Sequence, residues 1–96
     1  MSGDERFQFH LYIAGEAQNS SQAVANLDAI CREHLAGRYD IEIVDVLRQP
    51  DRALADGVLM TPTLVKSGPA PGRRIIGTLS KAQVVLEALG LRSVSA

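Results

Sequence analysis

Pro62 is the residue that most constrains how this chain can fold, because it stands between a helix-like segment and the β-rich run at 63–66. A proline has no backbone N–H to donate to a sheet, so Pro62 must open that strand and cannot lie inside it. The bond between Thr61 and Pro62 is also a favourable place for a cis peptide, which would leave the backbone of Thr61 exposed to pair with an extended partner. The alternative is a trans proline at the start of an edge strand.

The length and composition are those of one small globular domain. A chain of 96 residues with 46% hydrophobic residues supports one modest core and leaves no room for a second, and we expect the domain to span 1–96 with its core at 7–91. Ten basic and eleven acidic residues give a net charge of −1, which offers no basis for binding nucleic acid or an anionic membrane. No apolar run reaches the roughly 18 residues that span a bilayer, and the polar N-terminus is unlike a signal peptide. We therefore expect a cytoplasmic protein.

The first half of the chain predicts a strand, a helix and a second strand. Residues 7–14 alternate between apolar and polar side chains, which is typical of a strand. Apolar residues then recur at helical spacing as far as Gly37, and Asn19 with Gln22 resembles a capping box at the start of that helix. The β-branched run at 40–47 predicts a central strand that is buried on both faces at its C-terminal end. The two strands are expected to be parallel.

The second half predicts a short helix followed by a hairpin. Pro50 suits the first turn of a helix that Gly57 ends. The runs at 63–66 and 73–76 flank a connection rich in glycine and proline, so they are expected to pair as an antiparallel hairpin.

The last predicted helix covers residues 80–89. Ser80 and Gln83 resemble a second capping box, and Gly90 supplies a stop. The complete order is β-α-β-α-β-β-α with a proline opening the third strand. This is the thioredoxin-like order, so we predict an α/β single domain of that type.

The residues for thiol chemistry are missing. Cys31 is the only cysteine, which excludes an intramolecular disulfide, a CxxC pair and a zinc site built on several thiolates. It belongs to the apolar stripe of the first helix, so we expect a core residue and not a nucleophile. Glutathione-binding members of the fold usually carry an acidic residue and a serine at the start of the last helix, where this chain has Leu79 and Ser80. We predict no catalytic residues, no cofactor and no metal; a thiol- or glutathione-binding protein is the alternative.

Several short motifs, in the same order along the chain, resemble the KaiB family of circadian clock proteins over about residues 7–91. Among them are Leu11-Tyr12-Ile13-Ala14-Gly15, Ile43-Val44-Asp45-Val46-Leu47, Gln49-Pro50, Leu59-Met60-Thr61-Pro62-Thr63-Leu64 and Arg73-Arg74-Ile75-Ile76-Gly77-Thr78-Leu79-Ser80. A related domain forms the N-terminal sensor of the kinase SasA. The resemblance implies a non-enzymatic adaptor that docks on the N-terminal ATPase ring of a KaiC hexamer, competes there with SasA and sequesters KaiA, so that KaiC shifts towards dephosphorylation.

The resemblance also implies fold switching. KaiB proteins exchange between a homotetrameric ground state with a rearranged C-terminal half and a thioredoxin-like state that binds KaiC, which requires two packings that differ by only a few kcal/mol. The family usually has a glycine near the position of Ala88, and alanine favours a helix there by about 1 kcal/mol. With Pro62 opening the third strand and Gly90 ending the last helix, these residues are predicted to bias the chain towards the thioredoxin-like state. We therefore expect a monomer, with the homotetramer as the alternative.

The partner-binding surface is expected on the short helix and the proline loop, because exposed polar residues there have less reason to be present for packing. The candidates are Gln49, Asp51, Arg52, Asp56 and Thr61.

Two departures from the family pattern bear on the partners. Gly57 replaces a common lysine in the expected KaiC-docking surface, and Glu42 replaces a basic residue at the expected KaiA-binding edge. The expected partners are KaiC or a KaiC-like ATPase, and KaiA. A divergent paralogue that docks on a KaiC-like ATPase without KaiA is the alternative.

Overall fold

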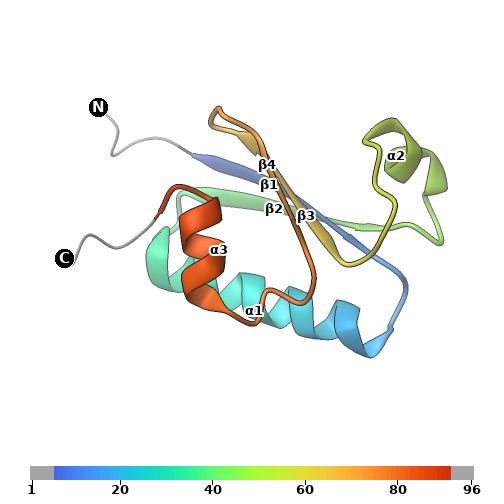
Figure 1. The fold of residues 1–96 in the computed structure, drawn as a ribbon, viewed down its shortest axis with the longest axis horizontal. Helices are drawn as coiled ribbons and strands as arrows, with labels where there is room; N and C mark the ends of the chain where they lie inside the picture. Colours follow the sequence, from blue (N-terminus) through green and yellow to red (C-terminus); the bar gives the residue numbers. More distant parts are fainter. Residues whose placement is uncertain (1–5, 92–96) are drawn as a thin grey trace.

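A four-stranded mixed sheet organises residues 6–91, the part of the chain that the computed structural model describes (Figure 1). The strands are β1 Phe7–Ile13, β2 Tyr39–Asp45, β3 Thr63–Gly68 and β4 Arg73–Ile76, and the helices are α1 Gln18–His34, α2 Pro50–Ala55 and α3 Ala82–Ala88. The strand order is β2-β1-β3-β4, with β1 parallel to β2 and antiparallel to β3. β3 and β4 are antiparallel. The predicted thioredoxin-like order and hairpin are confirmed.

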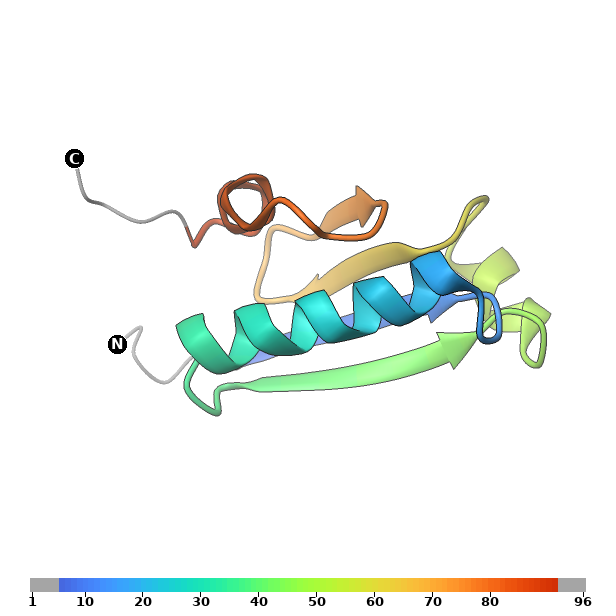
Figure 2. The same ribbon diagram turned by 90° about the horizontal axis from the view of Figure 1, so that it is seen from below.

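The helices lie on both faces of the sheet, and the alternation in β1 divides the core between them. Helices α1 and α3 cover one face and α2 covers one end of the other (Figures 1 and 2). Leu11 points into the larger cluster beneath α1 and α3, whereas its neighbour Tyr12 points into a smaller cluster beside α2. The smaller cluster consists of Tyr12, Val44, Ala53 and Val58. The composition predicted one core, but the sheet separates two.

Strand β2 lies at the edge of the sheet and is not the central strand that its β-branched run predicted. β1 pairs with β2 on one side and with β3 on the other, so the outer edge of β2 has no strand partner within residues 6–91. Val44 is fully buried, but Ile43 on the opposite face is 43% exposed. Branched side chains suit any pleated, half-buried surface, so their density does not by itself indicate burial on both faces.

Both predicted capping boxes are wrong. Helix α1 starts at Gln18 with Ala17 as its N-cap, and α3 starts at Ala82 with Lys81 as its N-cap, and neither cap residue makes a side-chain hydrogen bond. The hydroxyl that matters at the start of α1 belongs to the buried Ser20, whose Oγ accepts a hydrogen bond of 3.1 Å from the N–H of Ala14. This bond ties the first turn of α1 to the end of β1.

The glycine stops are confirmed. Gly57 and Gly90 have left-handed backbones with φ of 67° and 78°, which glycine adopts without steric penalty. After α2, the N–H of Val58 donates back to the carbonyl of Ala53 at 2.8 Å, the bond that defines a Schellman ending. Because Val58 and Ala53 also pack in the smaller cluster, this ending directs the chain from α2 towards Pro62.

Candidate partner-docking surface

Asp45 holds two loops at the same end of the sheet: the loop before α1 and the loop before α2. It ends β2, and its Oδ1 accepts hydrogen bonds of 3.0 Å from the N–H of Leu47 and 3.0 Å from the N–H of Gly15. The first bond turns the chain towards Pro50, which stands in the first turn of α2 as predicted. The second bond holds the loop before α1 against the same strand end. One carboxylate therefore positions both loops at this end of the sheet.

A hydrogen bond from the sheet holds the C-terminal end of α2. The hydroxyl of the fully buried Tyr12 donates to the carboxylate of Asp56, the residue that caps α2. Burial, together with the bond to Asp56, raises the pKa of Tyr12 to about 12. The guanidinium of Arg74 on β4 donates to the backbone carbonyl of the same Asp56.

An ion pair from β2 holds the middle of α2. The guanidinium of Arg52 donates two hydrogen bonds, of 2.8 and 2.9 Å, to the two carboxylate oxygens of Glu42. This bidentate pairing lowers the pKa of Glu42. The imidazole Nε2 of His10 lies 3.6 Å from the same carboxylate. The polar face of the sheet is thus joined to α2 through Glu42.

The five predicted partner-binding residues fall into two groups. Gln49 and Asp51 are exposed at the start of α2, and Thr61 is half-buried in the lining of a pocket. Arg52 and Asp56 bind Glu42 and Tyr12 within the chain. The argument that such side chains have little structural role therefore holds for Gln49 and Asp51 and does not hold for Arg52 and Asp56.

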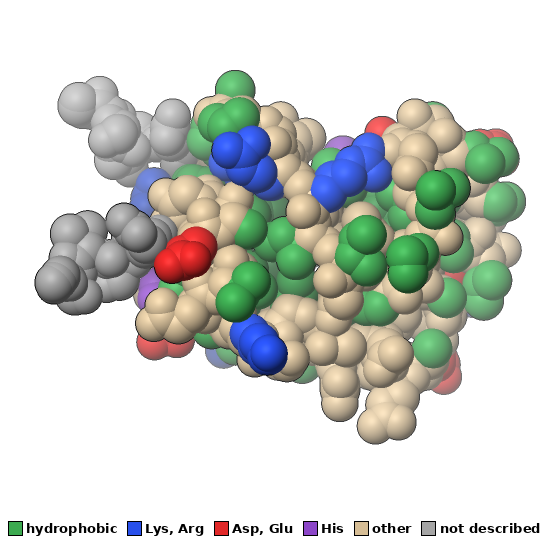
Figure 3. All heavy atoms as spheres, viewed as in Figure 1, with side chains coloured by type: hydrophobic (Ala, Val, Ile, Leu, Met, Phe, Trp, Pro, Cys, Tyr) green, Lys and Arg blue, Asp and Glu red, His purple; other side chains and the backbone are tan. Residues whose placement is uncertain are grey.

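The sequence interpretation missed an exposed apolar patch on α2 and the proline loop. Leu54 is 76% exposed, Leu59 is 89% exposed and Met60 is 57% exposed. With Thr61 they line a pocket of about 360 Å³ whose other lining residues are Val46, Pro50, Ala53 and Val58. Figure 3 shows hydrophobic side chains gathered at the end of the molecule where α2 lies. The available signal was that these residues fall outside every periodic stripe, and large apolar side chains left exposed together mark an interaction surface.

The proline loop has the expected geometry. The Thr61–Pro62 peptide is cis, and Pro62 directly precedes the first residue of β3. The hydroxyl of Thr63 donates to the carbonyl of Met60 at 2.6 Å, and the N–H of Gly77 donates to the carbonyl of Pro62 at 2.9 Å. These bonds fix the loop against both strands of the hairpin.

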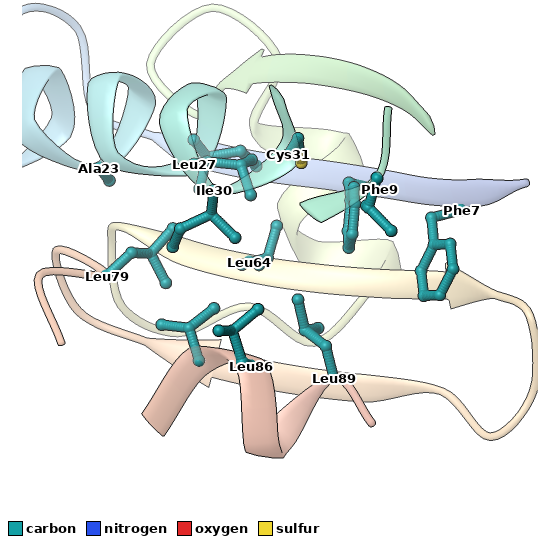
Figure 4. Close-up of a cluster of buried hydrophobic side chains, with 13 residues drawn as sticks. Phe7, Phe9, Ala23, Leu27, Ile30, Cys31, Leu64, Leu79, Leu86 and Leu89 are labelled. Atoms are coloured by element: carbon teal, nitrogen blue, oxygen red, sulfur yellow. The ribbon is translucent and has the colours of Figure 1, made fainter. Parts of the chain in front are cut away.

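The cysteine lies on the other side of the sheet from this surface. Cys31 is fully buried in the cluster beneath α1, in the layer that Figure 4 shows with Leu27 and Phe9. Burial raises the pKa of its thiol to about 12, which disfavours the reactive thiolate. Residues 6–91 contain no group of His, Cys, Asp and Glu side chains that could hold a metal ion. In the same range, no helix has both the length and the apolar character needed to cross a membrane.

The mixed sheet, the three helices and the cis proline before β3 define an α/β domain of the thioredoxin-like class. Solved structures agree. The N-terminal domain of Synechococcus elongatus SasA matches with a TM-score of 0.73 at 19% identity, over 96% of this chain and 90% of that domain. Chloroplastic thioredoxin z matches with a TM-score of 0.74 at 21% identity, over 91% of this chain and 79% of that protein.

The sequence narrows this class to one family. Residues 10–91 match the KaiB domain. The circadian clock protein KaiB3 of Synechocystis sp. is 48% identical over 86 residues, which cover 90% of this chain and 82% of that protein. The circadian clock oscillator protein KaiB of Prochlorococcus marinus is 42% identical over 91 residues, which cover 95% and 84%. The chain belongs to the KaiB family, and these relatives are named as circadian clock proteins.

Proposed function

We propose that this chain is a KaiB-like adaptor that docks, in its thioredoxin-like state, on the N-terminal ATPase ring of a KaiC or KaiC-like hexamer. One observation carries the proposal: a chain of the KaiB family has the same fold as the N-terminal domain of SasA. A shared fold places the corresponding helices and loops of the two domains in the same positions, although most of the side chains on them differ at 19% identity. On the basis of that likeness we propose that the chain competes with SasA for one site on the ring.

The surface around α2 supports docking on a protein. An apolar centre with a polar rim is the usual anatomy of a protein interface. Here Leu59 and Met60 provide exposed apolar area, and Gln49 and Asp51 provide polar groups beside it. The proposed activity is binding alone: the chain changes KaiC phosphorylation by displacing SasA and by sequestering KaiA, without catalysing a reaction.

The edge of β2 is the proposed place for KaiA. An edge strand offers unpaired backbone groups to another chain. Glu42 on this strand is already bound by Arg52, and it is acidic where the family pattern is basic. We expect KaiA to bind weakly at this edge, and a divergent adaptor that uses a KaiC-like ATPase without KaiA is the variant of the proposal that Glu42 favours. The adaptor is proposed to act as a cytoplasmic monomer.

The test is binding of the labelled chain to the isolated N-terminal ring of KaiC, with unlabelled SasA N-terminal domain as competitor. Asp51 is exposed and makes no hydrogen bond to another side chain within residues 6–91, so Asp51→Arg reverses a solvent-facing charge, and we expect it to weaken binding about tenfold. Glu33→Arg is the matched control, because Glu33 is exposed on α1, which covers the other face of the sheet.

Two negative results would have different meanings, one for the docking surface and one for the proposed function. Unchanged affinity of Asp51→Arg would mean that the docking surface lies elsewhere. No binding of the unsubstituted chain to KaiC rings, or binding that the SasA domain does not displace, would contradict the proposed function itself.

A further inference from the structure

Helix α2 is too short to hold its own position. It has six residues, of which only Ala53 is buried. Isolated helices shorter than about 12 residues are marginal in water, so a helix of this length depends on contacts with the rest of the chain. Its position on the sheet therefore depends on the packing of Ala53 in the smaller cluster and on the few polar bonds that reach it.

Those bonds come from three different strands. Glu42 on β2 binds Arg52 through both carboxylate oxygens, at 2.8 and 2.9 Å. Tyr12 on β1 donates to the carboxylate of Asp56, and Arg74 on β4 donates to the carbonyl of Asp56. The strands belong to one hydrogen-bonded sheet, so three anchors that converge on Arg52 and on the C-cap residue Asp56 restrain where the helix lies.

We propose that Glu42 and Tyr12 are positioning residues: they clamp α2 through Arg52 and Asp56, and so determine the affinity for the docking partner without touching it. The exposed residues Leu54 and Asp51 lie on the same short helix as Arg52, so the clamp also determines where these two side chains are presented. The proposal rests on the proposed function for its partner, a KaiC-like ring, while the clamp itself is a property of the free chain. It assigns Arg52 to the clamp and not to the contact surface.

A reciprocal exchange of charges distinguishes a clamp from a direct contact. Glu42→Arg and Arg52→Glu each break the pair, and we expect each to weaken binding to the ring by about two- to fivefold. The double variant restores an ion pair of opposite polarity and is expected to recover most of the lost affinity. If Arg52 touches the partner directly, the double variant stays as weak as Arg52→Glu, and the proposal is overturned.

A second exposed pair provides the matched control. Arg32 donates hydrogen bonds of 2.6 and 3.1 Å to one carboxylate oxygen of Asp28, so it forms an exposed arginine–carboxylate pair on α1, away from α2. Arg32→Glu introduces the same change of charge but leaves α2 alone, so its affinity for the ring should remain that of the unsubstituted chain. A loss equal to that of Arg52→Glu would show that net charge, and not the clamp, is responsible.

Hydrogen exchange in the free chain tests the clamp without any partner. The N–H groups of Asp56 and Val58 bond to the carbonyls of Arg52 and Ala53 at the end of α2. Both amides should exchange about two- to fivefold faster in Glu42→Arg and in Tyr12→Phe, and at the original rate in the charge-exchanged double variant. Unchanged exchange in both single variants would overturn the clamp. If the unsubstituted chain does not bind the ring but its exchange follows this pattern, the proposed function fails and the clamp stands.

Discussion

Tyr12 and Cys31 are both fully buried, on opposite faces of the sheet, and both have a pKa raised to about 12. In the unfolded chain these groups titrate near their ordinary values of 10.0 and 9.0. A raised pKa in the folded state means that the unfolded chain loses its proton first as the pH rises. The stability that each group contributes is therefore complete below its ordinary pKa and is lost between that value and about 12.

We predict that the free energy of unfolding falls above about pH 9, by at most about 1.4 kcal/mol per pH unit for each group. Urea unfolding at about pH 8 and about pH 10.5 measures this fall. Cys31→Ala should remove the part of the slope that begins near 9, and Tyr12→Phe the part that begins near 10. Equal stability of the unsubstituted chain at both pH values would contradict the burial of these two ionisable groups.

At the residue scale, the sequence predicted which polar side chains of α2 are exposed but not which residues of the sheet bind to them. Gln49 and Asp51 are exposed as predicted, because a short helix between loops leaves its polar residues in solvent. The bond between Tyr12 and Asp56 joins residues 44 positions apart, and the pair of Arg52 and Glu42 spans ten. Such pairings depend on how strands and helices are placed, so no local pattern could have indicated them.

At the scale of elements, the glycine helix stops and the start of α2 at Pro50 were predictable, but the starts of α1 and α3 were not. A left-handed backbone at Gly90 is a local requirement that a single glycine satisfies. The spacing of a capping box is compatible with a helix start but does not determine it. Helix α3 starts at Ala82, two residues later than predicted. A tertiary contact also holds the end of α3: the buried Lys66 of β3 donates to the carbonyl of Leu89 at 3.5 Å.

The resemblance to KaiB proteins implies a second, rearranged fold, and we propose that the balance between it and the thioredoxin-like fold depends on α3. Ala88 is its last residue, and Ala88→Gly should disfavour the helix by up to about 1 kcal/mol, which changes a two-state population by up to about fivefold. Backbone chemical shifts should then show a second set of signals in which residues 73–76 are helical. Ala29→Gly is the control, since it weakens α1 in the half of the chain that both folds share. The absence of a second set, or its appearance in both variants, would contradict this account of the bias.

At the scale of the whole molecule, the order of elements and the parallel and antiparallel pairings followed from the sequence, because βαβ units and hairpins join neighbours along the chain. The edge position of β2 and the division of the core did not follow. Both depend on β3 inserting beside β1, on the side away from β2, and this choice is made by long-range packing. The exposed apolar patch around α2 and the proline loop was missed for a different reason: its residues are close in sequence, but only the structure shows that they are exposed together.

The central proposal is that the thioredoxin-like fold described above is the binding-competent state, so that the chain binds its partner without first refolding. A protein already in its binding-competent state associates at a rate proportional to the partner concentration, whereas one that must convert first reaches a limiting rate. The most direct measurement is stopped-flow association of the labelled chain with increasing concentrations of KaiC-like N-terminal rings. The account predicts a single phase whose rate constant rises linearly with ring concentration. A slow phase that is independent of ring concentration, or no association at all, would contradict it.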